Sequence, residues 1–275
     1  MFGFLHALDI GGGALAGAYV LIAVIEHVEF SWIFLGSVLP LAIATFALTR
    51  CTTGRAAARP VDAGHSEPQG APVQRLPGAT PLLAASALFG FTYYSVGFPV
   101  LTTAQNSASK AYGIGAFLLF NALSAATGYV VAPRFGNGIA ERFRDLGVLG
   151  YLVSVSGAVL LAVGYAAHLS VAVLMVGVAA LGFSLGVVTT VEPSLMSVLR
   201  PGRQAGRGFG SLSAARSVGL VLGNLVMGLL YGLGADWAYG YAAIMGMAAV
   251  VIVLAAIPVA RRADRQVPRP GAAGA

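Results

Sequence analysis

The stretch from Leu169 to Leu199 reads LSVAVLMVGVAALGFSLGVVTTVEPSLMSVL. Its one acidic or basic side chain is that of Glu192, and the run exceeds the roughly 20 apolar residues that a helix needs to cross a bilayer. The rest of the chain has a similar composition. Of its 275 residues, 57% are hydrophobic and 9% are Asp, Glu, Lys or Arg, whereas a soluble domain carries about 25% charged residues. These values exclude a soluble α/β enzyme and a disordered chain, and they indicate a helical membrane protein.

Eight segments are apolar and long enough to be membrane-spanning helices. They are 3–25, 31–49, 81–103, 112–132, 147–166, 169–199, 207–232 and 237–259. The first lacks the basic region and the small-residue cleavage site of a signal peptide, so we expect it to stay in the protein. The predicted fold class is therefore all-α transmembrane, with eight membrane-spanning helices.

Basic residues are concentrated in alternate links between these segments. Of the sixteen lysines and arginines, fourteen lie in the links after the second, fourth and sixth spans or in the C-terminal tail, while Lys110 is the one on the opposite side. The positive-inside rule then predicts a multi-pass protein of the plasma membrane with both termini in the cytoplasm. Because topology accounts for the net charge of +6, we expect the lipid bilayer and not nucleic acid as a partner.

The beginning of the chain resembles a segment near its end. Five residues recur without a gap at a shift of 207 (210 − 3 for the first pair): Gly3, Leu5, Ala7, Gly12 and Leu15 correspond to Gly210, Leu212, Ala214, Gly219 and Leu222. The first two spans therefore look like copies of the last two. Residues 50–80, rich in Arg, Pro, Gly and Ala, are predicted to form a flexible cytoplasmic linker.

Three stretches resemble the major facilitator superfamily of transporters. Phe2–Gly12, followed by Ala16-Gly17, looks like the family's fifth helix. Pro133–Asp145, with its Glu141-Arg142-Phe143, is similar to the C-terminal copy of the family's loop motif G-x-x-x-D-R-x-G-R-R. Arg200–Gly210 resembles the turn into the eleventh helix.

This resemblance implies two helix bundles joined by a cytoplasmic linker, with the chain matching helices five to twelve of a twelve-helix fold. Residues 1–49 would be the last two helices of the N-terminal half. Residues 81–260 would be the complete six-helix C-terminal half, and 261–275 a cytoplasmic tail. About four helices of the family fold would then be missing, so we expect that the chain does not transport by itself.

Three ionisable residues fall inside predicted spans: Asp9, Glu192 and Arg216. Such residues are costly in a bilayer and are often functional. Glu192 precedes Arg200 by eight residues and Arg216 follows Arg207 by nine, which places both about 12–14 Å from the cytoplasmic end. An ion pair between these antiparallel neighbours is geometrically reasonable. Asp9 occupies the repeat position equivalent to Arg216. The three are candidates for substrate binding or ion coupling, with a purely structural ion pair as the alternative.

Weaker candidates lie elsewhere in the chain. Tyr93 and Tyr94 belong to an aromatic cluster that either lines a ligand cavity or packs against its surroundings. Asn121 is on a small, polar helix face for which helix packing is the alternative. The family resemblance implies that Glu141 and Arg142 form a conformational latch, and a solvated charged loop is the alternative.

The sequence contains no metal-ligand spacing, nucleotide-binding loop or nucleophile motif. We therefore expect neither an enzyme nor a bound metal or cofactor. The predicted function is secondary transport of a small molecule by alternating access, and the resemblance implies coupling to an ion, with protons as the first candidate and efflux favoured. The alternative is a non-transporting membrane subunit that assembles with another chain. Substrate and oligomeric state are left open.

Overall fold

The computed structural model describes residues 2–29, 78–92, 96–130, 134–136, 138–201 and 204–264, and the single positions 32, 36, 38, 43 and 46. The side chains of 2–9, 91 and 263 are outside that description. Contacts divide the chain into two compact units, one formed by Met1–Ala18 with Arg75–Ala275 and the other by Tyr19–Gln74. The predicted span 31–49 and nearly all of the linker 50–80 lie outside the described residues.

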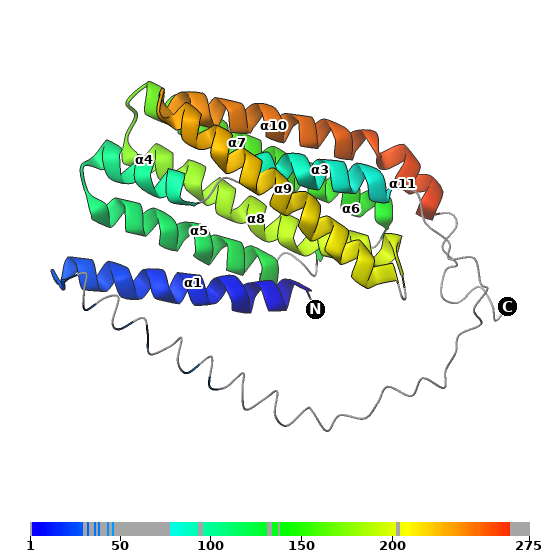
Figure 1. Ribbon diagram of the computed structural model, residues 1–275, viewed down its shortest axis with the longest axis horizontal. Coiled ribbons are helices and arrows are strands. Elements are labelled where there is room, and N and C mark those ends of the chain that lie inside the picture. Colours follow the sequence, from blue (N-terminus) through cyan, green and yellow to red (C-terminus); the bar gives the residue numbers. More distant parts are fainter. Residues whose placement is uncertain are drawn as a thin grey trace. The chain divides into compact units, whose positions relative to one another are not determined.

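The described part of the chain is helical and contains no strand. Its elements are α1 (Phe2–Ile25), α3 (Ala79–Thr92), α4 (Gly97–Ser107), α5 (Lys110–Val130), α6 (Ile139–Asp145), the π-helical segment η2 (Leu146–Leu152), α7 (Val153–Ala166), α8 (Val171–Leu199), α9 (Ala205–Tyr231), α10 (Ala235–Ala255) and α11 (Ile257–Asp264) (Figure 1).

Five helical stretches among the described residues are long and apolar enough to cross a membrane. They are Lys110–Val130, Ile139–Ala166, Val171–Leu199, Ala205–Tyr231 and Ala235–Arg262. Shorter apolar helices cover Ile10–Ile25 and Ala79–Gly90. The prediction of an all-helical membrane protein is confirmed to this extent.

The segment 81–103, predicted as one span, is divided in the structure. Helix α3 ends at Thr92 and α4 begins at Gly97. Pro99 lies in the first turn of α4, where a backbone N–H is not needed and the fixed φ of proline suits a new helix. The side chain of Thr92 donates to the carbonyl oxygen of Phe89 at 2.9 Å and so satisfies a backbone group in the last turn of α3.

Glycines allow pairs of these helices to approach closely. A Cβ atom on Gly182 of α8 would lie 2.5 Å from the carbonyl oxygen of Phe120 on α5. On α9, a Cβ atom on Gly219 would overlap the carbonyl oxygen of Ala87, and one on Gly90 of α3 would lie 2.5 Å from that of Arg216. Backbones pack this tightly in membrane helices only where side chains are absent or small.

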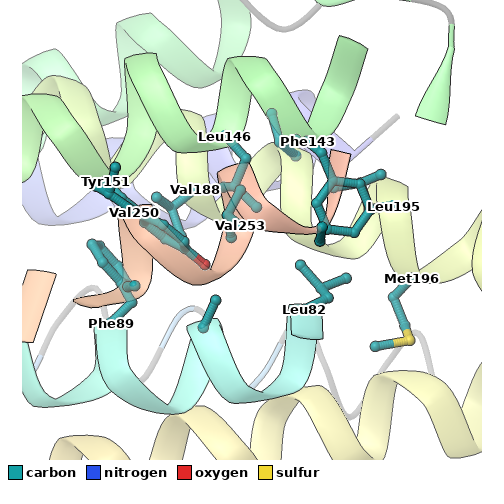
Figure 2. Close-up of a cluster of buried hydrophobic side chains, with 14 of the residues drawn as sticks. Leu82, Phe89, Phe143, Leu146, Tyr151, Val188, Leu195, Met196, Val250 and Val253 are labelled. Atoms are coloured by element: carbon teal, nitrogen blue, oxygen red, sulfur yellow. The ribbon is translucent and has the colours of Figure 1, made fainter. Parts of the chain in front are cut away.

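Two clusters of buried apolar side chains fill the interior of the larger unit, which is formed by Met1–Ala18 with Arg75–Ala275. The larger one is drawn in Figure 2, where Phe89, Leu146, Tyr151 and Val250 gather between helices from distant parts of the sequence. The rings of Phe89 and Tyr151 stack with centroids 4.9 Å apart and planes inclined by 26°. This stack joins α3 to η2 inside the core.

The helix pairs from α3 to α11 follow a two-fold pattern. Helix α3 packs on α9 as α8 packs on α5, and α7 packs on α8 as α10 packs on α3. Each pair becomes the other when the first three helical segments (α3 with α4, α5, and α6 with η2 and α7) are exchanged for the last three (α8, α9, and α10 with α11) in chain order. Because the chain reverses direction three times between α3 and α8, the two repeats run in opposite directions. This is the pattern of two inverted three-helix repeats.

Replacing Gly219 by alanine should destabilise the unit, because the new methyl group meets backbone atoms of α3 that cannot move aside. We expect the free energy of unfolding, measured by detergent titration of the purified chain, to fall by about 1–3 kcal/mol. Gly228 on the same helix has open space around its Cα. Gly228→Ala should therefore leave stability unchanged or raise it by up to about 1 kcal/mol. Equal effects of the two substitutions would contradict the close approach.

Candidate functional site

The carboxylate of Glu192 is the centre of a buried polar cluster. The residue lies on α8 and is 0% exposed. Its Oε1 accepts a hydrogen bond from the Tyr151 hydroxyl at 2.5 Å, and its Oε2 accepts one from the Ser86 hydroxyl at 2.9 Å. The Arg216 guanidinium forms an ion pair with the same Oε2. Side chains from α3, η2, α8 and α9 therefore converge on one carboxylate.

This set of donors explains how a carboxylate is tolerated in an apolar interior. An isolated buried charge costs several kcal/mol even after the protein relaxes. Here both oxygens of Glu192 accept hydrogen bonds, and one of the donors carries a positive charge. Bonds of this kind are about twice as strong as bonds between neutral groups.

The local structure of each helix places its donor. Ser86 and Phe89 are three residues apart on α3 and so share one face of that helix. Phe89 stacks on the Tyr151 ring and fixes the direction of its hydroxyl. Tyr151 belongs to the π-helical segment η2, and such segments occur frequently at functional sites. The close approach at Gly90 and Gly219 brings α3 against α9, so that Ser86 and Arg216 reach the same oxygen.

The ion pair has an inner and an outer partner. The Glu192 side chain is 0% exposed, whereas 24% of the Arg216 side chain is exposed. The Glu192 carboxylate thus binds an arginine whose side chain is partly exposed, although its Nε atom is buried. A carboxylate in this position can orient a planar guanidinium, whose fork of donors suits recognition of polar or anionic groups.

The structure brings together two of the candidate residues predicted from the sequence, Glu192 and Arg216. Asp9 lies on α1, but its side chain is outside the described residues, as are Tyr93 and Tyr94 altogether. Asn121 on α5 is buried and donates to the carbonyl oxygen of Phe117 in its own helix at 2.8 Å. Its predicted role in binding stays a prediction.

The predicted latch residues lie at the N-terminal end of α6. Arg142 donates from Nε to the carbonyl oxygen of Gly136 at 3.1 Å and from a guanidinium nitrogen to the Ser194 hydroxyl at 2.8 Å. Glu141 accepts from the backbone N–H of Gly138 at 3.4 Å. Because Ser194 is two residues beyond Glu192, Arg142 connects this link to the part of α8 that carries the buried carboxylate.

Sequence reasoning did not identify Ser86, Tyr151 or Asp264 as site or capping residues. Asp264 at the end of α11 accepts the backbone N–H groups of Ile139 at 2.7 Å and Ala140 at 3.0 Å, so it caps a helix 124 or more residues away. For Ser86 and Tyr151, the sequence shows only a polar side chain within an apolar segment. That pattern does not reveal that both side chains bind Glu192.

A second polar cluster lies at the opposite end of the unit. The Thr102 hydroxyl is 2.6 Å from the Tyr239 hydroxyl and 2.9 Å from that of Tyr231. Tyr231 also donates to the Gln105 side chain at 3.2 Å. These bonds join α4, α9 and α10 and make the short helix α4 part of the bundle.

Comparisons of the chain with models of known protein families, with curated proteins and with solved structures found no match in any of the three. What the structure itself gives is an all-helical described part with five stretches long and apolar enough to cross a membrane and a buried carboxylate paired with Arg216. The finer assignment rests on the residues themselves.

Removing one partner of the ion pair should cost more than removing both. Arg216→Ala leaves a buried carboxylate without its charged partner and should lower the free energy of unfolding by about 3–5 kcal/mol. Glu192→Ala leaves a partly exposed guanidinium and should lower it by less. The double variant should lose less than the sum of the single variants. Glu141→Ala, which removes an exposed carboxylate, is the control and should change stability by less than about 1 kcal/mol. Strictly additive losses would show that the two side chains do not interact.

The cap on α6 can be tested by hydrogen exchange. Asp264→Ala removes the acceptor of the Ile139 and Ala140 amide protons. We expect the exchange of these amides to accelerate about fivefold, in line with a loss of about 1 kcal/mol for a missing cap. Amides within α8 should keep their protection. Unchanged exchange at both capped positions would exclude the Asp264 cap.

Proposed function

We propose that the protein is a secondary transporter of the major facilitator type, which moves a small molecule by alternating access. In this proposal the Glu192–Arg216 pair belongs to the substrate or coupling site. Arg216 contacts the substrate, and Glu192 is the residue that positions it.

The observation that carries the proposal is an ion pair inside a bundle whose helices are long and apolar enough to cross a membrane, with the arginine side chain partly exposed. Ionisable residues within spans are costly, and they mark substrate and ion pathways in many membrane proteins. An ion pair whose only role is to hold two helices together has no need of an exposed side chain. The partial exposure of Arg216 favours a role in binding.

Two further features support the transporter class. The inverted pairing of α3 to α7 with α8 to α11 is the internal symmetry on which many transporter folds are built. Helix α4 begins at Gly97 after a turn at Val96, and such folds use helices that start within a predicted span near their binding sites. Asp9, at the repeat position equivalent to Arg216, is proposed as a second coupling residue, with protons as the coupling ion.

Arg142 and Glu141 are proposed as the conformational latch. The Arg142–Ser194 bond ends two residues from Glu192, so a change in the link between α5 and α6 and a change at the buried pair act on the same segment of α8. Pro193 lies between these two positions and removes one backbone hydrogen bond from that segment. We infer that α8 bends here when access alternates.

Substrate binding can be measured on the purified chain in detergent without requiring that the chain transports by itself. The melting temperature of the chain is recorded while amino acids, sugars, organic acids and hydrophobic cations are added in turn. We expect at least one class to raise the melting temperature in a saturable way. Arg216→Lys should weaken that binding about tenfold, because an ammonium group cannot reproduce the planar donors of arginine.

The control is Arg262→Lys, which changes an exposed arginine outside the cluster and should bind like the wild type. Detergent titration of each variant shows whether it is folded before binding is measured. The proposal fails if no compound binds the chain, or if the folded Arg216→Lys variant binds normally. Isolation of the chain from its native membrane in a fixed ratio with a second membrane protein, without transport, would favour the alternative of a non-transporting subunit.

A further inference from the structure

A cavity of about 340 Å³ lies between α6 and α11. Its walls include Ala140, Glu141 and Arg144 from α6 and Ile257, Arg261 and Asp264 from α11. This volume is within the range of about 300–1,000 Å³ that is typical of small-molecule sites. The buried cluster around Glu192 shares none of these residues, so the cavity is a separate feature.

The acidic groups of the cavity are already engaged by the backbone. Both oxygens of Asp264 accept N–H groups at the start of α6, and Glu141 accepts the N–H of Gly138. The positive groups are more available. Arg144 pairs with the neighbouring Asp145 at 3.1 Å, but its side chain is 62% exposed, and exposed pairs contribute little. Arg261 forms no hydrogen bond or ion pair with another residue in the described part of the chain.

The cavity lies at the ends of two helical stretches that are long and apolar enough to cross a membrane. Helix α6 begins the span Ile139–Ala166, and α11 contains the end of the span Ala235–Arg262. Seven arginines among the described residues lie at this end of the unit, against three carboxylates. The arginines are Arg134, Arg142, Arg144, Arg200, Arg207, Arg261 and Arg262, and the carboxylates are Glu141, Asp145 and Asp264. The surplus of positive charge attracts anionic lipids.

We propose that this cavity binds the headgroup of an anionic phospholipid. The phosphate accepts hydrogen bonds from Arg144 and Arg261, and the glycerol backbone lies against the apolar side chains of Ala140 and Ile257. The two arginines of the lining are balanced by Glu141 and Asp264, so the positive surplus that attracts an anionic lipid comes from the surrounding arginines, while Arg144 and Arg261 supply the donors for the phosphate. The proposal requires that the chain spans a membrane and is independent of any transport activity.

Native mass spectrometry of the full-length chain in detergent, titrated with phosphatidylglycerol, tests this site. Arg261→Gln should weaken lipid binding at least tenfold, because it removes a direct hydrogen bond between the guanidinium and the phosphate, and hydrogen bonds to charged groups contribute about 1.5–3 kcal/mol. Arg144→Gln should have a similar effect. Arg262→Gln is the matched control, since it removes the same charge from the adjacent position without lining the cavity, and it should weaken binding less than about twofold.

Equal losses for Arg261→Gln and Arg262→Gln would overturn the site, because the lipid would then respond to overall charge alone. Equal binding of phosphatidylcholine would overturn the preference for an anionic headgroup. A third titration uses soluble glycerol 3-phosphate. If it binds as tightly as the lipid, the cavity is a phosphate site and not a lipid site. Detergent titration of each variant confirms that it is folded.

Discussion

The structure depends on the need to satisfy one carboxylate inside an apolar helical bundle. Glu192 is fully buried, so its oxygens must find donors on neighbouring helices, and they do so on α3, η2 and α9. Each of these bonds fixes the rotation of a helix about its own axis, which apolar contacts alone define poorly. The penalty for an unpaired buried charge therefore selects one arrangement of the four elements.

Close backbone contact makes that arrangement attainable. The glycines at 90 and 219 let α3 and α9 meet, and those at 182 and 186 do the same for α8 and α5. Since these two helix pairs correspond under the inverted repeat, the same packing is used twice in the unit. The buried cluster then lies where α3, α8 and α9 come together, and its one partly exposed member, Arg216, is presented at the edge of the unit.

The sequence was sufficient to predict the positions of the apolar helices, because a bilayer requires about 20 apolar residues in each span. The lengths of the apolar segments predicted the helices from α5 to α10 within a few residues. The exception is the predicted span 147–166, which begins earlier in the structure, with α6 at Ile139. The distances of Glu192 and Arg216, counted in residues from the arginines at the ends of their helices, are similar, and this similarity suggested that the two side chains pair. The hydroxyl donors Ser86 and Tyr151 could not be found, because their contacts depend on helix rotation and on the π-helical register of η2. The division at Gly97 was also missed, since apolar composition continues through it. The roles of Asp9, Tyr93 and Tyr94 stay predictions.

Glu192 and Arg216 form a direct hydrogen-bonded ion pair, on which the arrangement of the surrounding helices depends. Solid-state NMR can measure the separation of the Glu192 carboxyl carbon and the Arg216 guanidinium nitrogens in the isotope-labelled chain, reconstituted in a bilayer. We predict a separation below about 4 Å, as in a hydrogen-bonded carboxylate–guanidinium pair. A separation beyond the reach of a direct hydrogen bond, with both groups in solvent or lipid contact, would contradict the account.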